Sequence, residues 1–165
     1  MSGDSFDALS QITGALDYPM IIVTTAAAGD RSGCLVGFHT QCSIDPARFL
    51  VCISKANHTG DVVSRAATVV LHFLTKDDRS LAELFGEQTG DEVDKFERCR
   101  WRAGPDGVPV LKDVPAWVAG RIIDRLDPGD HVALVVEPFA GEAADQPAPQ
   151  LSFQDVRDME PGHPA

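Results

Sequence analysis

The sequence predicts an α+β fold, mainly β, built on an antiparallel sheet or barrel with a few flanking helices. Apolar or alternating segments of strand length recur along the chain, and short Gly-, Pro- or Asp-containing turns separate most of them. Only two or three segments have helical spacing, and they do not alternate regularly with strands, so a doubly wound parallel sheet is not expected. No repeat or linker divides the 165 residues, which predicts a single domain over 1–165 with a loose tail at 157–165.

The first half of the chain is predicted to hold two helices and four strands. Helical spacing of apolar residues indicates an amphipathic N-terminal helix, with Asp4 or Ser5 as its N-cap. Its apolar residues are Phe6, Leu9, Ile12 and Leu16. Strands are expected at 20–28, 35–44, 48–54 and 68–75. Asp45-Pro46 ends the second strand, because proline donates no ladder hydrogen bond. A short helix is expected at 57–67.

The second half is predicted to hold a helix, a long hairpin and a closing strand. The expected elements are a helix at 77–87, a polar stretch at 94–101, a turn at 103–109, strands at 116–126 and 131–141, and a last short strand at 151–156. Asp77 is the expected N-cap of the helix. The Pro-Gly-Asp sequence at 128–130 makes the turn of the hairpin.

Composition and charge limit the classes of partner. The chain carries 25 acidic and 14 basic residues, for a formal net charge of −11. This field repels phosphate backbones and anionic lipid surfaces, so neither a nucleic acid nor a membrane partner is expected. The opening MSGDSFDALSQ has no basic n-region, and no stretch approaches the roughly 18–20 apolar residues of a membrane-spanning helix, which indicates a cytoplasmic protein. The cysteines form no C-x-x-C pair and the histidines are dispersed, so no metal site is predicted.

The stretch LVGFHTQCSIDPARFL (35–50) begins as a strand whose two faces differ. One set of alternate residues, from Val36 to Ile44, is mostly apolar, whereas the set beginning Leu35, Gly37 and His39 turns polar halfway along. Glycine inside a strand often marks the close approach of a ligand or of another backbone. The second face is therefore predicted to meet a ligand, although a half-exposed structural role for the histidine is an equally good interpretation of that residue alone.

Three other places in the sequence suggest binding, and each has a structural alternative. Lys55, Asn57 and Thr59 surround a helix start, where backbone N–H groups and a cation suit a phosphate, but Asn57 or Thr59 would also serve as an ordinary N-cap. Lys95 either reaches the same phosphate or is a solvated charge. His131 follows a Gly-Asp turn at the start of an apolar strand, where a histidine is more often structural.

Four segments, in order, resemble the flavin reductase family, whose members have the FMN-binding split-barrel fold. GCLVGFHTQCSIDPARFLVCISKANHT (33–59) is similar to the family's G-x-T-A-S-S-F-x-S-V-S-x-D-P strand and the S-x-T helix start that follows. DKFERCRWRAGPDGVPVLKDVPAW (94–117) resembles its D-K-F…W…G-x-P-V-L…A-W segment. LDPGDHVALVVEPFAG (126–141) resembles its G-D-H-x-L-x-x-G-E-V hairpin, and PQLSF (149–153) its closing P-L-x-Y strand. The resemblance covers about residues 14–155.

The resemblance implies an enzyme that transfers a hydride from NADH or NADPH to FMN. It also implies a homodimer with the flavin near the subunit interface, often supplying reduced flavin to a partner monooxygenase. His131 is the implied catalytic residue, positioning the nicotinamide and tuning charge at the flavin ring. The implied cofactor-binding residues are Leu35, Val36, Gly37, Phe38, His39, Thr40, Ser54, Lys55, Asn57, Thr59 and Lys95.

The chain departs from the family pattern at two places. Gly37-Phe38-His39 stands where the family usually has Ser-Ser-Phe, and Phe153 stands where it has a closing tyrosine. Two hydroxyls suited to the polar tail of the flavin are therefore missing, which leaves FAD and the deazaflavin F420 open beside FMN. Two alternative functions also stay open: a module that binds or stores flavin or haem without turnover, and an F420-dependent reductase.

Overall fold

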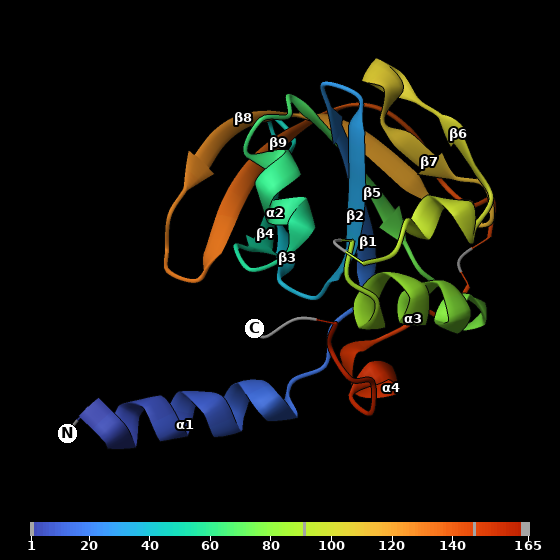
Figure 1. Cartoon of the computed structure of the whole chain (residues 1–165). Coiled ribbons are helices and arrows are strands. Elements are labelled where there is room, and N and C mark those ends of the chain that lie inside the picture. Colours follow the sequence, from blue (N-terminus) through green and yellow to red (C-terminus); the bar gives the residue numbers. More distant parts are fainter. Residues whose placement is uncertain (1, 91, 147, 163–165) are drawn as a thin grey trace.

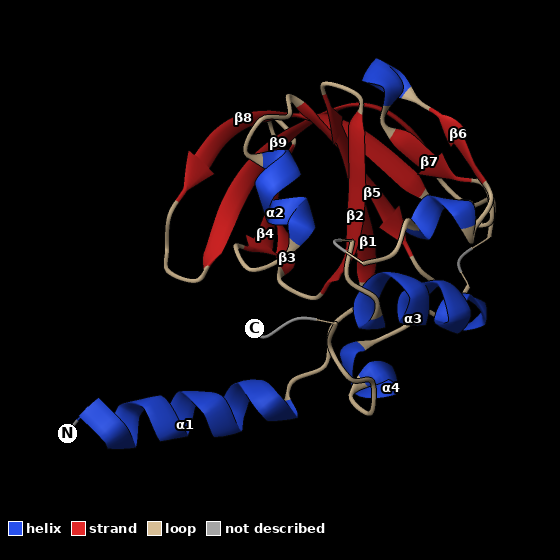
Figure 2. Cartoon of the chain, in the orientation of Figure 1, coloured by secondary structure: helices blue, strands red, loops and turns tan. Residues whose placement is uncertain are grey.

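One antiparallel sheet of seven strands forms the centre of the computed structural model, which describes residues 2–90, 92–146 and 148–162. The strands are β1 (Ile21–Ala27), β2 (Asp30–Val36), β3 (His39–Ser43), β4 (Arg48–Ser54), β5 (Thr68–Phe73), β8 (Trp117–Leu126) and β9 (His131–Glu142). They lie in the order β2-β1-β5-β8-β9-β4-β3, and Figure 2 shows that the sheet is strongly curved. The predicted α+β fold, mainly β, is confirmed.

The two edge strands of this sheet, β2 and β3, follow each other in the chain. Only Gly37 and Phe38 separate them in sequence, although five strands lie between them in the sheet. The sheet must therefore curl until its edges approach, and because β2 and β3 do not pair, the barrel stays split. Helix α2 (His58–Val63) packs on β1, β2 and β4 (Figure 1). This is the split barrel that the resemblance implies.

Three further helices and a small hairpin lie outside the barrel. They are α1 (Ser2–Ala15), α3 (Arg79–Glu87), α4 (Phe153–Val156) and the pair β6 (Trp101–Ala103) and β7 (Pro109–Leu111). In Figure 1, α1 extends away from the sheet, and the predicted apolar residues on it, Phe6, Leu9 and Ile12, are 60% to 72% exposed, while the predicted Leu16 lies just beyond its end. None of the described helices is long and apolar enough to cross a membrane.

The core has two main parts, on opposite faces of β1. Ile21 and Val23 point into the barrel with Leu71 and Leu134, whereas Ile22 points outward into a second cluster that α3 and α4 cover. Because β1 is buried on both faces, its first three residues are all apolar instead of alternating. The buried Thr24 and Thr25 that follow donate their hydroxyls to the carbonyls of Pro109 and Thr68. At about 25 cal/mol per Å² of apolar surface, this burial is the main favourable contribution to folding.

The structure corrects the predicted strand at 35–44. The chain leaves β2 at Val36 and enters β3 at His39, so the segment belongs to two strands that pair with different neighbours. The alternate residues predicted to face the core do not all do so, since Phe38 is 56% and Ile44 84% exposed. Two extended segments in succession look like one strand in a sequence, because alternation does not reveal a change of pairing partner.

Four smaller expectations are also wrong. The segment predicted as a last strand at 151–156 forms α4, which begins at Ser152 with a capping box to Asp155; Ser152 makes only an isolated bridge to Pro19. The short strands β6 and β7 lie where a polar stretch at 94–101 and a turn at 103–109 were predicted. A 3₁₀ turn capped by Thr75 precedes α3, so Asp77 is not its N-cap. Finally, α1 begins at Ser2, and both predicted N-caps therefore lie inside it.

The predicted loose tail lies partly outside the described residues, which end at 162. Within them, Met159 packs against the cluster that α3 covers, and the Gly162 N–H donates to the Gly86 carbonyl at 3.1 Å. Residues 157–162 therefore return to α3.

Candidate functional site

Four chain segments converge at one end of the split barrel. The register of β4 and β9 places Ser54 opposite His131. The Cys52 N–H donates to the Phe38 carbonyl at 2.9 Å, which holds the link between β2 and β3 beside β4. Asn57 follows β4 directly as the N-cap of α2. Sheet pairing and the link between β2 and β3 thus bring together residues that lie far apart in the sequence.

These segments enclose a cavity of about 810 Å³, which we call the crossover cavity. Seven of the predicted site residues line it: Leu35, Val36, Gly37, Phe38, Ser54, Asn57 and His131. Its other walls are mainly apolar and come from α1, the segment after α1, and α4, through Phe6, Leu9, Tyr18 and Phe153. The volume lies within the roughly 300–1,000 Å³ of small-molecule sites, and the mixture of apolar walls with a few polar groups is typical of them.

His131 is held by its neighbour Asp130. The His131 Nδ1 lies 2.7 Å from Asp130 Oδ1, and the hydrogen bond from His131 holds the pKa of Asp130 below its ordinary value. The carboxylate accepts, so Nδ1 carries the proton and Nε2 is the ring nitrogen that Asp130 leaves open. The imidazole also meets the ring of Phe38, with centroids 5.2 Å apart and planes tilted by 45°. Sequence reasoning did not select Asp130, although the Gly-Asp-His order was a visible signal.

Asn57 has the predicted N-cap role and also lines the crossover cavity. Its side-chain oxygen accepts from the Thr59 N–H at 3.0 Å, which is the ordinary N-cap bond. Asn57 can therefore cap α2 and still contact a ligand in the cavity.

Five predicted residues lie outside the crossover cavity: His39, Thr40, Lys55, Thr59 and Lys95. The His39 Nε2 lies 2.6 Å from the Pro19 carbonyl, and its ring stacks on Phe49, 5.6 Å between centroids. Burial lowers the pKa of His39. The Thr40 hydroxyl donates to the Gln41 carbonyl on the exposed surface. Lys55 pairs with Asp127, and Thr59 is fully buried with its hydroxyl 2.9 Å from that of Ser32.

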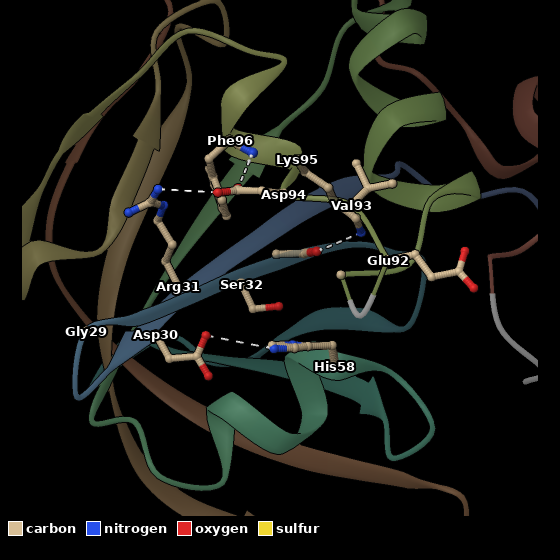
Figure 3. Close-up of a pocket in the computed structure, with 12 residues that line it drawn as sticks. Gly29, Asp30, Arg31, Ser32, His58, Glu92, Val93, Asp94, Lys95 and Phe96 are labelled. Carbon is tan, nitrogen blue, oxygen red and sulfur yellow. Dashed lines mark hydrogen bonds and ion pairs between the residues drawn. The ribbon is translucent and has the colours of Figure 1, made fainter.

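Lys95 lies beside a second, smaller pocket of about 390 Å³ (Figure 3). We call it the acidic pocket, because Asp30, Glu92 and Asp94 line it. The Lys95 Nζ donates to the carbonyls of Gly33 and Phe85, both at 3.0 Å, and only 4% of the residue is exposed. Burial lowers the pKa of Lys95. The lysine therefore ties β2 to the end of α3, and two of its three donors bind backbone carbonyls.

Lys95→Met is expected to destabilise the protein by about 2 kcal/mol, because two buried carbonyls lose their donor. The ratio of the FMN and riboflavin affinities should stay unchanged, since riboflavin lacks only the phosphate. Thermal unfolding and flavin fluorescence titration measure the two quantities, with the exposed Lys112→Met as the control. A selective loss of FMN affinity would instead place Lys95 on the phosphate.

The crossover cavity fits a flavin by the chemistry of its walls. A flavin has a flat, largely apolar ring system and a polar tail, and the cavity offers aromatic side chains together with the hydroxyl of Ser54 and the amide of Asn57. Among the described residues, no group of three or more His, Cys, Asp or Glu is placed to hold a metal ion.

A split barrel with a cavity of this kind is the arrangement that the sequence resemblance implies. The chain belongs to the flavin reductase family: residues 13–160 match the family model described as "Flavin reductase like domain".

Individual relatives agree with this assignment. The chain is 30% identical over 138 residues to a probable flavin reductase of Rhizobium meliloti (strain 1021), covering 82% of this chain and 43% of that protein. It is 29% identical over 141 residues to the stachydrine N-demethylase reductase subunit Stc3 of the same organism, covering 82% of this chain and 59% of the relative. The chain thus spans about half the length of these two proteins.

A solved structure shares the fold along nearly the whole chain. The flavin reductase domain protein from Arthrobacter sp. FB24 superposes with a TM-score of 0.82 at 23% identity, covering 96% of this chain and 95% of that one.

Proposed function

We propose that the protein reduces flavin with NADH or NADPH, with the crossover cavity as the active site. The observation that carries the proposal is the convergence of His131 with the link between β2 and β3 on one cavity, in a chain of the flavin reductase family. FMN is the proposed flavin, with FAD and F420 as alternatives. Cytoplasm is the proposed compartment.

A bound flavin would supply the redox chemistry, as the group that can take a hydride from a nicotinamide. The chain supplies position and electrostatics. The backbone around Gly37 and Phe38 would hold the ring system, and the Ser54 hydroxyl and the Asn57 amide would hold the polar tail. His131, with its tautomer fixed by Asp130, orients the nicotinamide. Lys55, Thr59, Lys95, His39 and Thr40 keep structural roles in this proposal, because their polar groups are engaged or lie elsewhere.

The test is consumption of NADH and of NADPH with FMN, FAD or F420 as the acceptor, against a protein-free control. Turnover that depends on protein and on flavin supports the proposal. Flavin that binds with no consumption of either nicotinamide supports a binding module instead, the alternative that the missing hydroxyls at Gly37 and Phe38 favour.

A homodimer and a monooxygenase partner belong to the same proposal. Three large apolar side chains on α1, those of Phe6, Leu9 and Ile12, are exposed, and a 14-residue helix is marginal in water without tertiary packing, so a second subunit could cover this face. The relative named as a reductase subunit supports a partner enzyme. Light scattering should give twice the chain mass, and a monomer at every concentration would contradict the dimer.

A further inference from the structure

We propose that Tyr18 is a further binding residue of the site, which holds the flavin ring system by stacking, and that Gly37 is required because it makes room for Tyr18. The inference rests on the proposed function and adds a residue to it. Tyr18 belongs to none of the motifs of the sequence and comes from the segment between α1 and β1.

The first observation is a close approach that only glycine allows. A Cβ atom on Gly37 would lie 2.6 Å from Tyr18 Cε2 and 3.4 Å from the sulfur of Met20. The first distance is shorter than carbon atoms tolerate, so any side chain at residue 37 would push the tyrosine ring from its place. A serine here, as in the usual family pattern, is incompatible with Tyr18 in this position. The two residues therefore form a pair.

The second observation is that the tyrosine ring is fixed. It stacks on Phe153 with centroids 4.9 Å apart and planes 15° from parallel. The Phe153 N–H donates to the Tyr18 carbonyl at 2.8 Å. The Asp17 carboxylate accepts from the N–H groups of Tyr18 and Gln154, at 3.1 and 3.0 Å. These hydrogen bonds join the start of α4 to the segment before β1. They fix the Tyr18–Phe153 pair before any ligand binds.

The third observation is where this pair lies. Tyr18 and Phe153 both line the crossover cavity, and so does the second aromatic pair, Phe38 and His131. The phenol of Tyr18 is neutral at physiological pH, and burial raises its pKa further above the ordinary value. Rigid neutral aromatic rings favour a flat conjugated ligand through offset stacking. The Tyr18–Phe153 pair is therefore suited to a ring system and not to a phosphate.

The test is a double-mutant cycle on Tyr18→Ala and Gly37→Ser, read by fluorescence titration with FMN and with riboflavin. Each single variant should raise the dissociation constants of FMN and riboflavin by the same factor, about tenfold, because the two ligands share the ring system. The double variant should bind no more weakly than Tyr18→Ala, since the added serine then has no tyrosine to displace. Gly129→Ser is the matched control, because a side chain there meets no atom within 4 Å.

Three results would overturn the inference while leaving flavin reduction intact. The first is an unchanged flavin affinity in Tyr18→Ala. The second is a double variant whose loss of affinity equals the product of the two single losses. The third is a loss of affinity for FMN but not for riboflavin, which would place Tyr18 at the phosphate tail. If Gly37→Ser does not fold, Tyr18→Leu decides alone, because it keeps an apolar side chain and removes the stacking ring. Its expected result is again an equal loss of about tenfold for both flavins. Wild-type protein that binds neither flavin would contradict the proposed function itself, and the inference with it.

Discussion

Replacing His131 with Asn is expected to lower kcat/KM for the nicotinamide by roughly 10- to 100-fold, while the flavin dissociation constant changes little. The reason is geometric: His131 lies at the start of β9, beside Phe38, and in the proposed function it orients the nicotinamide and does not hold the flavin tail. Steady-state kinetics with varied NADH or NADPH, and flavin titration of the same preparation, measure both effects. Unchanged kinetics would remove His131 from the site.

Asp130→Asn should produce a smaller loss, about tenfold, through the same histidine. The carboxylate accepts from Nδ1, and the amide can present either an acceptor or a donor, so the fixed tautomer is lost. The pH dependence of kcat/KM should also shift, which a purely structural role would not cause. The matched control is Asp127→Asn in the same turn, since Asp127 pairs with Lys55 outside the cavity. Equal effects of the two variants would contradict a positioning role for Asp130.

The second large expected effect concerns His72 and the stability of the protein. His72 is fully buried on β5, where its Nδ1–H donates to the Ile22 carbonyl at 3.1 Å and its Nε2 accepts from the Leu111 N–H at 3.0 Å. This neutral ring joins β1, β5 and β7. Replacement by Leu leaves a buried donor and a buried acceptor without partners, so the free energy of unfolding should fall by about 2–5 kcal/mol at pH 7.

The same residue makes stability depend on pH. Burial lowers the pKa of His72 from 6.5 to about 4, so between these values the unfolded chain binds a proton that the folded protein excludes. The free energy of unfolding therefore falls as the pH drops from 6.5 towards 4, by about 3 kcal/mol for this group. Urea unfolding at pH 7 and pH 4.5 measures the difference. The loss of unfolding free energy between pH 7 and pH 4.5 should be smaller in His72→Leu than in the wild type by about 2 kcal/mol. An equal loss in both proteins would contradict this role of His72.

The strands were the most predictable part of the fold, because a buried face imposes a pattern on them. β1, β4, β5, β8 and β9 lie where apolar runs and turn residues placed them. The break at Gly37 was not predictable from alternation, since both halves of the segment are extended and only their partners differ. At α4 a usable signal was present: Ser152 and Asp155 form a capping box, but the alternation of LSFQDV also suits a strand.

The candidate site was predictable as far as it lies on the strands of the family motifs. Leu35 to Phe38, Ser54, Asn57 and His131 do meet at one cavity. Lys95 illustrates what a sequence hides, because nothing in Asp-Lys-Phe indicates that the ammonium group is buried against two carbonyls. Tyr18 is missing from the motifs for a similar reason: its contact with Gly37 joins segments whose approach depends on the curvature of the whole sheet.

The most direct test of flavin reduction is the absorbance spectrum of the purified protein with FMN under anaerobic conditions, before and after addition of NADH or NADPH. The account predicts that the oxidised flavin band bleaches faster than in the protein-free control, and that His131→Asn slows the bleaching without releasing the flavin. Bound flavin that stays oxidised with both nicotinamides would contradict the account and indicate a binding module.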